Sequence, residues 1–348
     1  MSTLETNSIG KYSTNNVSFD DALNLKSYDT AGRNALTSVA GDMIYNTTTG
    51  KVEYYDGSAW VQTGADNFQV QALVIAGGGG GGMFEGGGGA GGYISTVDSE
   101  NSGGGTASNK YYAITGTNYA VSIGSGGTGG SYNPSTTATR GTDTYFGSLL
   151  AVGGGNGGNS GATNIGFRGG SGGGSSNSTA AEGTANQGFD SGTGAGTAYK
   201  PSGGGGAGSA GDNWATGAGG DGGSGVSSSI TGSSIGRAGG GGSGGSDNAS
   251  FTHTAGSATD GGGAGGYDTT GTNGTTNTGG GGGAGGLSTD GTKVWTSGNG
   301  GSGVVILRYP NTVSITVGAG LTAGTETAIA SEKYIEITAG TGTVSWSS

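Results

Sequence analysis

Runs of consecutive glycine constrain this chain more than any other feature of its sequence. Residues 76–93 read AGGGGGGMFEGGGGAGGY, and similar runs return as far as residue 303. In all, 91 of the 348 residues are glycine and only 3 are proline. A glycine in regular structure costs roughly 0.5–1 kcal/mol relative to alanine, because it loses more conformational freedom on folding. The chain therefore either leaves these runs disordered or needs the missing Cβ atom for a specific kind of packing.

The rest of the composition excludes several kinds of site. There is no cysteine and only one histidine, His253, which excludes disulfides, cysteine-based metal sites and zinc sites built from several histidines. The formal net charge of −11, from 12 basic and 23 acidic residues, argues against nucleic-acid binding, which needs a basic face. Charged residues make up 10%, compared with ~25% in an ordinary globular domain. This composition is typical of a neutral, hydroxyl-rich extracellular surface rather than of a metabolic enzyme.

Neither the start of the chain nor its apolar runs indicate ordinary secretion or membrane insertion. The first residues, MSTLE, contain no basic region and no apolar core, so we expect no signal peptide. No apolar run approaches the ~18–20 residues that span a bilayer. A protein of this kind that works outside a cell would leave by another route, such as release of assembled virions by lysis.

Residues 1–65 have an ordinary glycine content and predict an N-terminal β module for attachment or assembly. The expected strands are residues 42–45, 51–55 and 59–62, with turns at residues 46–50 and 56–57. Residues 20–35 are expected to be irregular, or partly helical through Ala22 and Leu23. Trp60 and Tyr54, like Trp346 near the other end, are expected in β cores.

Residues 66–310 hold the glycine runs together with strand-like apolar segments. These segments are residues 69–76 (QVQALVIA), 119–124 (YAVSIG), 145–152 (YFGSLLAV) and 304–309 (VVILRY). Residues 311–348 return to β patterning, with alternation over residues 313–317 and a predicted final hairpin of residues 334–338 and 343–346 around residues 339–342. The expected fold is mainly β and irregular, with N- and C-terminal β modules on either side of a glycine-rich domain.

An internal repeat argues that the glycine runs are ordered. The sequence GGGAGGY occurs at residues 87–93 and 261–267, GGGAGGL at residues 281–287, and a weaker copy, GGGAGS, begins at Gly204. Flexible linkers do not place a large apolar residue at the same position of a repeat, because they serve by lacking structure.

Extended helices with three residues per turn explain the runs best. Collagen is excluded, because it needs glycine at every third position and abundant proline. An isolated threefold helix has no internal hydrogen bonds, so its backbone groups must find partners on neighbouring helices when it is buried. The close approach that this requires leaves no room for Cβ atoms on packed faces. An alanine or serine can sit where a helix faces solvent or a surrounding sheath.

The order of these motifs resembles the glycine-rich domain of bacteriophage tail fibres and tail-tip adhesins. The matching segments are residues 72–82, 86–93, 119–127, 145–155 and 301–309, and residues 41–62 also resemble a module of phage fibre proteins. The resemblance implies a sandwich of polyglycine II-type helices near a fibre tip, whose joining loops bind the host receptor. It assigns no individual binding residue, because these loops vary freely in the family.

The segments that interrupt the glycine runs are the candidate binding sites, because exposed aromatic side chains on a rigid scaffold are common binding anchors. They are residues 83–85, 188–201, 212–216, 247–254, 267–277 and 289–296. The candidate receptor-binding residues are Phe84, Phe189, Tyr199, Trp214, Phe251, His253, Tyr267 and Trp295. The alternative is that such side chains fold over the ends of the glycine helices and shield them.

Cofactor, metal and catalytic sites are not expected. The sequence VIAGGGGGG resembles a dinucleotide-binding fingerprint, but more glycine follows where that fingerprint needs a helix. Asp221 and Asp260 precede glycines without the period of calcium-binding repeats, which leaves only an incidental calcium site open. No carboxylate pair has the spacing of a glycosidase, so we expect no enzyme.

Two functions follow from these features. The preferred one is a virion tail fibre or receptor-binding adhesin, with a host surface protein or glycan and other tail-fibre subunits as partners, in a homo-oligomer that is a trimer or a polymer. The alternative is a self-assembling structural subunit of an extracellular or viral fibre. In that case residues 313–317 and 334–338 would be edge strands that pair with the N-terminal strands of a neighbouring copy.

Overall fold

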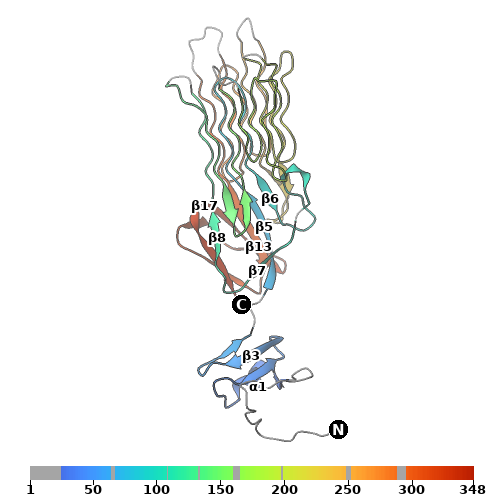
Figure 1. Cartoon of the computed structure of the whole chain (residues 1–348), viewed down its shortest axis with the longest axis vertical. Helices are drawn as coiled ribbons and strands as arrows, with labels where there is room; N and C mark the ends of the chain where they lie inside the picture. The colour runs from blue at the N-terminus through green and yellow to red at the C-terminus, as the bar shows by residue number, and fades with distance from the viewer. Residues whose placement is uncertain are drawn as a thin grey trace, which may run out of the picture. The chain divides into compact units, whose positions relative to one another are not determined.

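The computed structural model describes residues 25–63, 67–107, 109–131, 134–159, 165–196, 199–247, 252–287 and 295–348. These residues belong to two compact units that divide between Ala65 and Asp66. Their secondary structure is mainly β, with long stretches that are neither helix nor strand (Figure 1).

The first unit is a small sheet with the strand order β1-β2-β3-β4. Its elements are β1 (Ser27–Tyr28), α1 (Thr30–Asn34), β2 (Met43–Asn46), β3 (Lys51–Tyr55) and β4 (Trp60–Gln62). The three strands expected from the sequence are confirmed as β2, β3 and β4. The helix α1 begins after Asp29, whose carboxylate accepts a hydrogen bond of 2.6 Å from the Gly32 N–H. Ala22 and Leu23 lie outside the described residues.

The expectation that Tyr54 and Trp60 lie in a β core is wrong. Tyr54 is exposed and Trp60 is half-buried. Side chains alternate between the two faces of a strand, and in β3 the buried position belongs to Glu53 rather than to its neighbour Tyr54. The buried side of this sheet is thus partly polar, because Glu53 is held there by Arg33 and Asn46.

The second unit contains a large antiparallel sheet and a short two-stranded one. The main path of the large sheet is β10-β9-β8-β17-β13-β5-β6, with β7 paired to β5, and β14, β15 and β16 paired to β17. The elements are β5 (Asn67–Ile75), β6 (Tyr93–Ser95), η1 (Gly103–Gly105), β7 (Tyr111–Ile114), β8 (Tyr119–Ser122), β9 (Thr144–Phe146), β10 (Leu149–Ala151), β11 (Val226–Ser228), β12 (Ile235–Arg237), β13 (Val304–Pro310), β14 (Ser314–Val317), β15 (Leu321–Ala323), β16 (Thr327–Ile329) and β17 (Glu332–Ser347).

The central strands β5 and β13 are buried on both faces, which explains their nearly continuous apolar sequences. Alternate residues of each strand enter different clusters: Val74 and Val305 lie in one, and Ile75 and Val304 in the other. The first cluster also contains Trp346, which confirms its predicted place in a β core. The expected strands at residues 69–76, 119–124 and 304–309 are confirmed as β5, β8 and β13.

The single strand expected over residues 145–152 is wrong. These residues form the hairpin β9–β10, in which Leu149 pairs with Phe146. The two-residue turn between the strands places Gly147 at a φ of 54°, a conformation that glycine adopts without steric cost. Gly147, in the middle of the apolar segment 145–152, therefore marks a turn and not a continuous strand.

The C-terminal hairpin expected from residues 334–338 and 343–346 is also wrong, because both lie in the single long strand β17. Its first half pairs with β13 and its second half with β8. Gly340, at a φ of 95°, lies between the halves and lets the strand change neighbours. Residues 334–338 are not an edge either, since β15 and β16 pair with the other side of this half.

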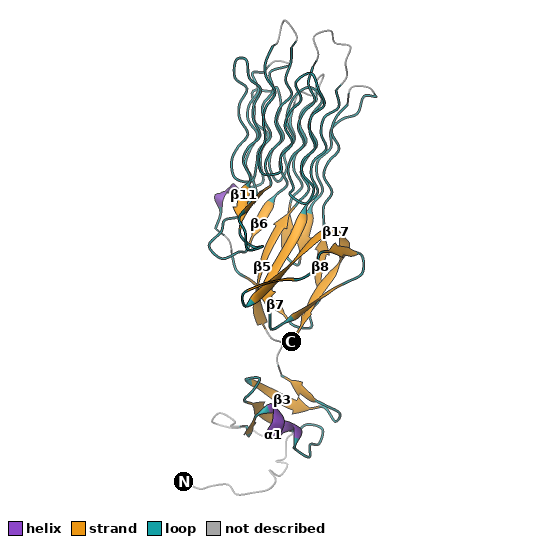
Figure 2. Cartoon of the chain, turned by 180° about the vertical axis from the view of Figure 1, so that it is seen from behind, coloured by secondary structure: helices purple, strands orange, loops and turns teal. Residues whose placement is uncertain are grey.

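Strand ends of the large sheet continue directly into the glycine runs, which extend from it as a bundle of extended chains (Figure 2). The run at residues 77–82 shows how these chains are joined. Its first and fourth N–H groups donate to residues 139–142, the second and fifth to residues 298–301, and the third and sixth to residues 86–89, at 2.8–3.1 Å. The partner changes at every residue and returns after three, which is the period of a threefold helix.

The carbonyl groups of the same run contact three further neighbours. The first and fourth accept from residues 153–158, the second and fifth from residues 124–130, and the third from residues 279–285. Three neighbours that accept and three that donate make six, so this helix is surrounded on all sides by others. Every backbone N–H and C=O group of residues 77–82 has a partner, the last carbonyl through the Ser297 hydroxyl at 2.8 Å.

Glycine is required at these positions because neighbouring backbones occupy the place of a side chain. A Cβ atom would lie 2.0 Å from the carbonyl oxygen of Thr128 if built on Gly80, and 2.1 Å from that of Gly155 if built on Gly79. Each such Cα carbon instead points a hydrogen at a carbonyl oxygen, a weak attractive contact. The array is thus held by polar contacts rather than by apolar burial.

The expectation that alanines of the repeat face solvent or a sheath is wrong for three of the four. Ala90, Ala207 and Ala284 are fully buried, whereas Ala264 is half-buried. Ala90 and Ala207 belong to the apolar cluster on one face of β5 and β13, so their methyl groups fill space where glycine helices meet the sheet. Ala284 is buried within the array, where it bonds to Gly242 and Gly266.

Candidate functional site

The chains of the array turn at both of its ends, and one set of turns gathers at the end opposite the large sheet (Figure 1). Backbone hydrogen bonds connect turns that are far apart in sequence. The Gly244 N–H donates to Glu85 at 2.9 Å, the Thr254 N–H to Gly217 at 3.1 Å, and the Gly196 N–H to Ser176 at 2.9 Å. We call this end the tip, defined by the described residues 83–85, 176–178, 199–200, 214–217, 252–254, 267–269 and 295.

Most of the candidate residues lie at the tip but differ in exposure. Tyr267 is the most open of them, with 44% of its surface exposed. Tyr199, Trp214 and Trp295 are half-buried, whereas Phe84 and His253 are buried. Phe251 lies outside the described residues.

Phe189 does not lie with the others. Its N–H donates to Gly206 at 3.0 Å, next to Ala207, which accepts from Gly104 of η1. Phe189 lines a cavity together with Gly104 and Asn186, at the end of the array that meets the sheet. The structure therefore separates it from the tip.

His253 ties two turns of the tip together. Its Nε2 atom lies 3.0 Å from the carbonyl oxygen of Tyr199, and its Nδ1 atom lies 3.3 Å from that of Thr254. A carbonyl only accepts, so the ring nitrogen that forms either bond carries a proton. The backbone of His253 also exchanges two hydrogen bonds with Ser246, at 2.9 and 3.0 Å. These contacts give the histidine a structural role in holding the tip together.

Two tryptophans pair with charged residues of neighbouring turns. The ammonium group of Lys200 lies 5.1 Å from the ring centroid of Trp214, a cation–π contact. The indole N–H of Trp295 donates to Asp268 at 3.1 Å. Next to Asp268, the ring of Tyr267 covers Gly245, where a Cβ atom would lie 2.7 Å from it. The half-buried rings are thereby held in place with part of their surface open.

Glu85 is a residue that the sequence analysis did not single out. It is fully buried, in the turn that follows the run at residues 77–82. Burial raises the pKa of its carboxyl to about 7. The hydroxyl of Ser176 and the backbone N–H groups of Tyr199 and Ser176 face the carboxyl and oppose this rise. Neither carboxyl oxygen makes a hydrogen bond of good geometry, so the cost of desolvating the charged carboxylate is larger than the stabilisation from these groups. The sequence does mark Glu85 in one way, because it is the one charged residue of AGGGGGGMFEGGGGAGGY.

The described residues contain no group of three or more histidine, cysteine, aspartate or glutamate side chains that is arranged to hold a metal ion. Within the same residues, no helix is both long and apolar enough to cross a membrane. The chemistry that the tip offers is thus aromatic surface, backbone groups and a few charges.

The profile of a glycine-rich domain family matches residues 47–310, which is most of the chain. The chain belongs to this family. Neither a curated protein nor a solved structure matches it significantly. The match begins within the first unit and ends with β13, so it includes every glycine run described above.

Proposed function

We propose that this chain is a tail fibre or tail-tip adhesin of a bacteriophage, in which the glycine array is a rigid platform and the tip binds the host cell surface. The observation that carries the proposal is the set of turns that forms the tip, at the end of an array whose inner backbone groups are bonded on all sides. Loops on a rigid scaffold lose little entropy when they bind, and aromatic side chains such as Tyr267 and Trp214 supply contact area.

The proposal also specifies the binding partners of the chain and its location on the virion. The tip would take a host surface protein or glycan, and the first unit would join other tail-fibre subunits or further copies in a homo-oligomer on the virion. The proposal assigns the tip a binding role and no catalytic one. The alternative of polymerisation would have to use residues 313–317, because β14 pairs only with β17 among the described strands, whereas residues 334–338 already have partners on both sides.

Adsorption of phage particles that carry tip variants tests the proposal. Tyr267→Ala combined with Trp214→Ala removes two aromatic surfaces of the tip and is expected to slow adsorption to the host at least about tenfold, the effect of ~1.4 kcal/mol of binding free energy. The control is Tyr112→Ala on β7, which removes an equally exposed aromatic ring from the sheet.

The control is expected to leave adsorption unchanged, and both variants should keep the unfolding temperature of the parent. Shortening residues 212–216 and 252–254 to glycine linkers extends the test to the tip backbone. Unchanged adsorption of all these folded variants would contradict a receptor-binding role.

A further inference from the structure

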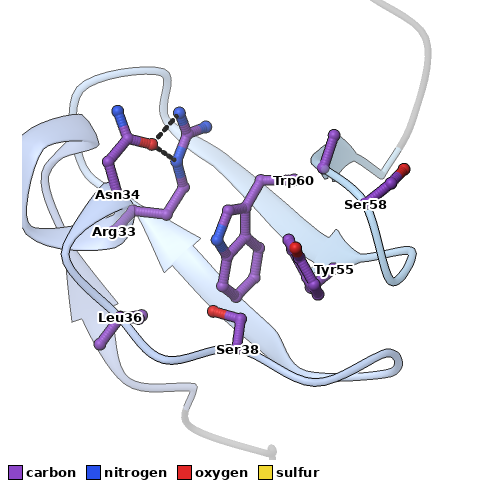
Figure 3. A pocket seen from close by; sticks show the side chains of 8 residues that line it. Arg33, Asn34, Leu36, Ser38, Tyr55, Ser58 and Trp60 are labelled. Carbon is purple, nitrogen blue, oxygen red and sulfur yellow. Dashed lines mark hydrogen bonds between the residues drawn. The ribbon is translucent and has the colours of Figure 1, made fainter.

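The first unit contains a pocket of about 380 Å³ between the end of α1 and the turn that joins β3 to β4 (Figure 3). Its walls include Arg33, Asn34, Ser38, Tyr55, Ser58 and Trp60. The volume lies within the ~300–1,000 Å³ range of small-molecule sites. Neither the glycine array nor the tip contributes to it.

One wall of the pocket is aromatic. Tyr55 and Trp60 are directly opposite each other in β3 and β4, and their ring centroids lie 5.6 Å apart at an interplanar angle of 57°. Figure 3 shows the indole of Trp60 extending into the pocket beside the Tyr55 ring. A half-buried ring on a strand is a rigid apolar platform with a polar edge.

The charged group of the pocket is neutralised within the protein. One guanidinium nitrogen of Arg33 donates to buried Glu53 at 2.8 Å, and two others donate to the Asn34 side-chain oxygen at 2.8 and 3.1 Å. Burial opposes the ionisation of Glu53, but the hydrogen bonds from Arg33, Asn46 and Thr49 outweigh it and lower its pKa. The ion pair Arg33–Glu53 is therefore formed at neutral pH, and the pocket offers no free cation to an anionic ligand.

Uncharged polar groups of the pocket do have open hydrogen-bonding capacity. The Ser38 hydroxyl oxygen is buried without a partner among the described residues. The Asn34 side-chain oxygen is occupied by Arg33, which leaves the amide nitrogen of Asn34 to donate elsewhere. The opposite rim is rigid, because the N–H groups of Ser58 and Ala59 both donate to Asp56, at 2.7 and 2.8 Å.

We propose that this pocket binds the terminal ring of a neutral saccharide. A pyranose has an apolar face that stacks on an aromatic ring, and a rim of hydroxyl groups that hydrogen-bond as donors and acceptors. Trp60 and Tyr55 match the face, and the Ser38 hydroxyl and the Asn34 amide match the rim. The neutralised Arg33 selects against acidic sugars. This site is independent of the tip, because all the residues that line it belong to the first unit.

Saturation-transfer NMR on the full chain tests the proposal with glucose, galactose, mannose, N-acetylglucosamine and glucuronic acid. We expect transfer to at least one neutral sugar and none to glucuronic acid. Trp60→Ala and Ser38→Ala are each expected to weaken binding at least about tenfold, while Trp60→Phe, which keeps an aromatic platform, retains part of it. The matched control is Tyr112→Ala, an exposed aromatic residue on β7 outside both the pocket and the tip, which should bind the sugar as the parent does.

Three results would overturn the proposal. They are no transfer to any of the neutral sugars, transfer that persists in both Trp60→Ala and Ser38→Ala, and stronger binding of glucuronic acid than of the neutral sugars. If Trp60→Ala instead changes the solution mass of the protein, the pocket is an interface between copies of the chain. Ser38→Ala removes only one oxygen atom and should leave the fold intact, so a loss of sugar binding in this variant is not explained by misfolding. Adsorption of Tyr267 and Trp214 variants is a separate measurement, so either proposal can fail alone.

Discussion

A single methyl group is expected to disrupt the glycine array. If Gly80 becomes alanine, the new Cβ atom would lie 2.0 Å from a backbone carbonyl that has no freedom to move aside. Overpacking of an interior typically costs about 1–3 kcal/mol, and we expect Gly80→Ala to reach at least the upper part of this range. Denaturant unfolding measures the change.

The control for this substitution is Gly324→Ala. A Cβ atom on Gly324 would have a carbonyl oxygen at 3.8 Å as its nearest neighbour, an ordinary contact. The control is expected to leave stability unchanged or to increase it slightly, because alanine restricts the unfolded chain. Equal unfolding midpoints for the two variants would refute the close packing of the array.

The buried carboxyl of Glu85 is expected to make stability depend on pH in an unusual direction. Its pKa is about 7 in the folded protein and near 4.5 in the unfolded chain, so the folded state binds the proton more tightly. Its contribution is therefore most favourable below pH 4.5 and is lost as the pH rises towards 7 and beyond. Glu85→Gln should stabilise the protein above pH 7 by a few kcal/mol, at ~1.4 kcal/mol per pKa unit, with little effect near pH 4.

Unfolding of Glu85→Gln at a series of pH values, against the parent, checks this expectation. Glu326→Gln is the control of opposite sign. Burial opposes the ionisation of Glu326, but hydrogen bonds from Tyr309 and Lys333 outweigh it and lower its pKa. That variant should lose stability at neutral pH rather than gain it. A Glu85→Gln variant that is less stable than the parent at pH 8 would contradict the desolvation of Glu85.

At the scale of elements, the large sheet depends on the end of its last strand. Trp346 in β17 is fully buried and packs edge-on against Phe68, Tyr119 and Tyr309, with ring centroids 5.5–5.7 Å apart. Loss of a buried tryptophan typically costs about 3–5 kcal/mol, and we expect Trp346→Ala to fall in this range by denaturant unfolding.

Tyr112→Ala is the matched aromatic control for the sheet, because Tyr112 is largely exposed on β7. It should change the free energy of unfolding by less than about 0.5 kcal/mol. Similar losses from the two substitutions would mean that the core does not depend on the Trp346 cluster.

Secondary structure was predicted best where the local sequence pattern matches the environment of the segment in the fold. The apolar runs of β5 and β13 indicated buried strands, and consecutive glycine indicated helices packed without Cβ atoms. The C-terminal strand was not predictable in the same way. Residues 339–342 of β17 read AGTG, which is typical of a turn, and pairing with β15 and then with β8 keeps the chain extended there.

The candidate site could be predicted as a set of loops but not as a surface. Aromatic residues between glycine runs indicated where recognition would lie, and most of those described do meet at the tip. Burial of Phe84 and His253, and the place of Phe189 at the other end of the array, depend on which runs are neighbours. The saccharide pocket escaped notice because Trp60 and Arg33 are 27 residues apart, and only the packing of α1 on the sheet brings them together.

At the scale of the whole molecule, stabilisation by polar packing should be visible in calorimetry. Unfolding of an ordinary protein raises the heat capacity by ~12–15 cal/mol/K per residue, or about 4–5 kcal/mol/K for 348 residues. Exposure of apolar surface increases this quantity and exposure of polar surface lowers it. Because the array buries backbone rather than apolar side chains, we expect a value clearly below 4 kcal/mol/K from differential scanning calorimetry. A value of 5 kcal/mol/K or more would show that apolar burial dominates.

The hydrogen bonds from residues 77–82 to residues 298–301 also have a consequence for synthesis. The second and fifth N–H groups of the first glycine run, and the β13 edge of strand β5, find their partners only when the last part of the chain arrives. A growing chain on the ribosome must therefore hold its first run open during most of translation. We expect slow folding, because most of the hydrogen-bond partners of this run are distant in sequence. Chains that stop before Gly298 keep open backbone groups along that run and along β5, and such edges recruit other chains. Premature termination should thus yield aggregates rather than a shorter folded array.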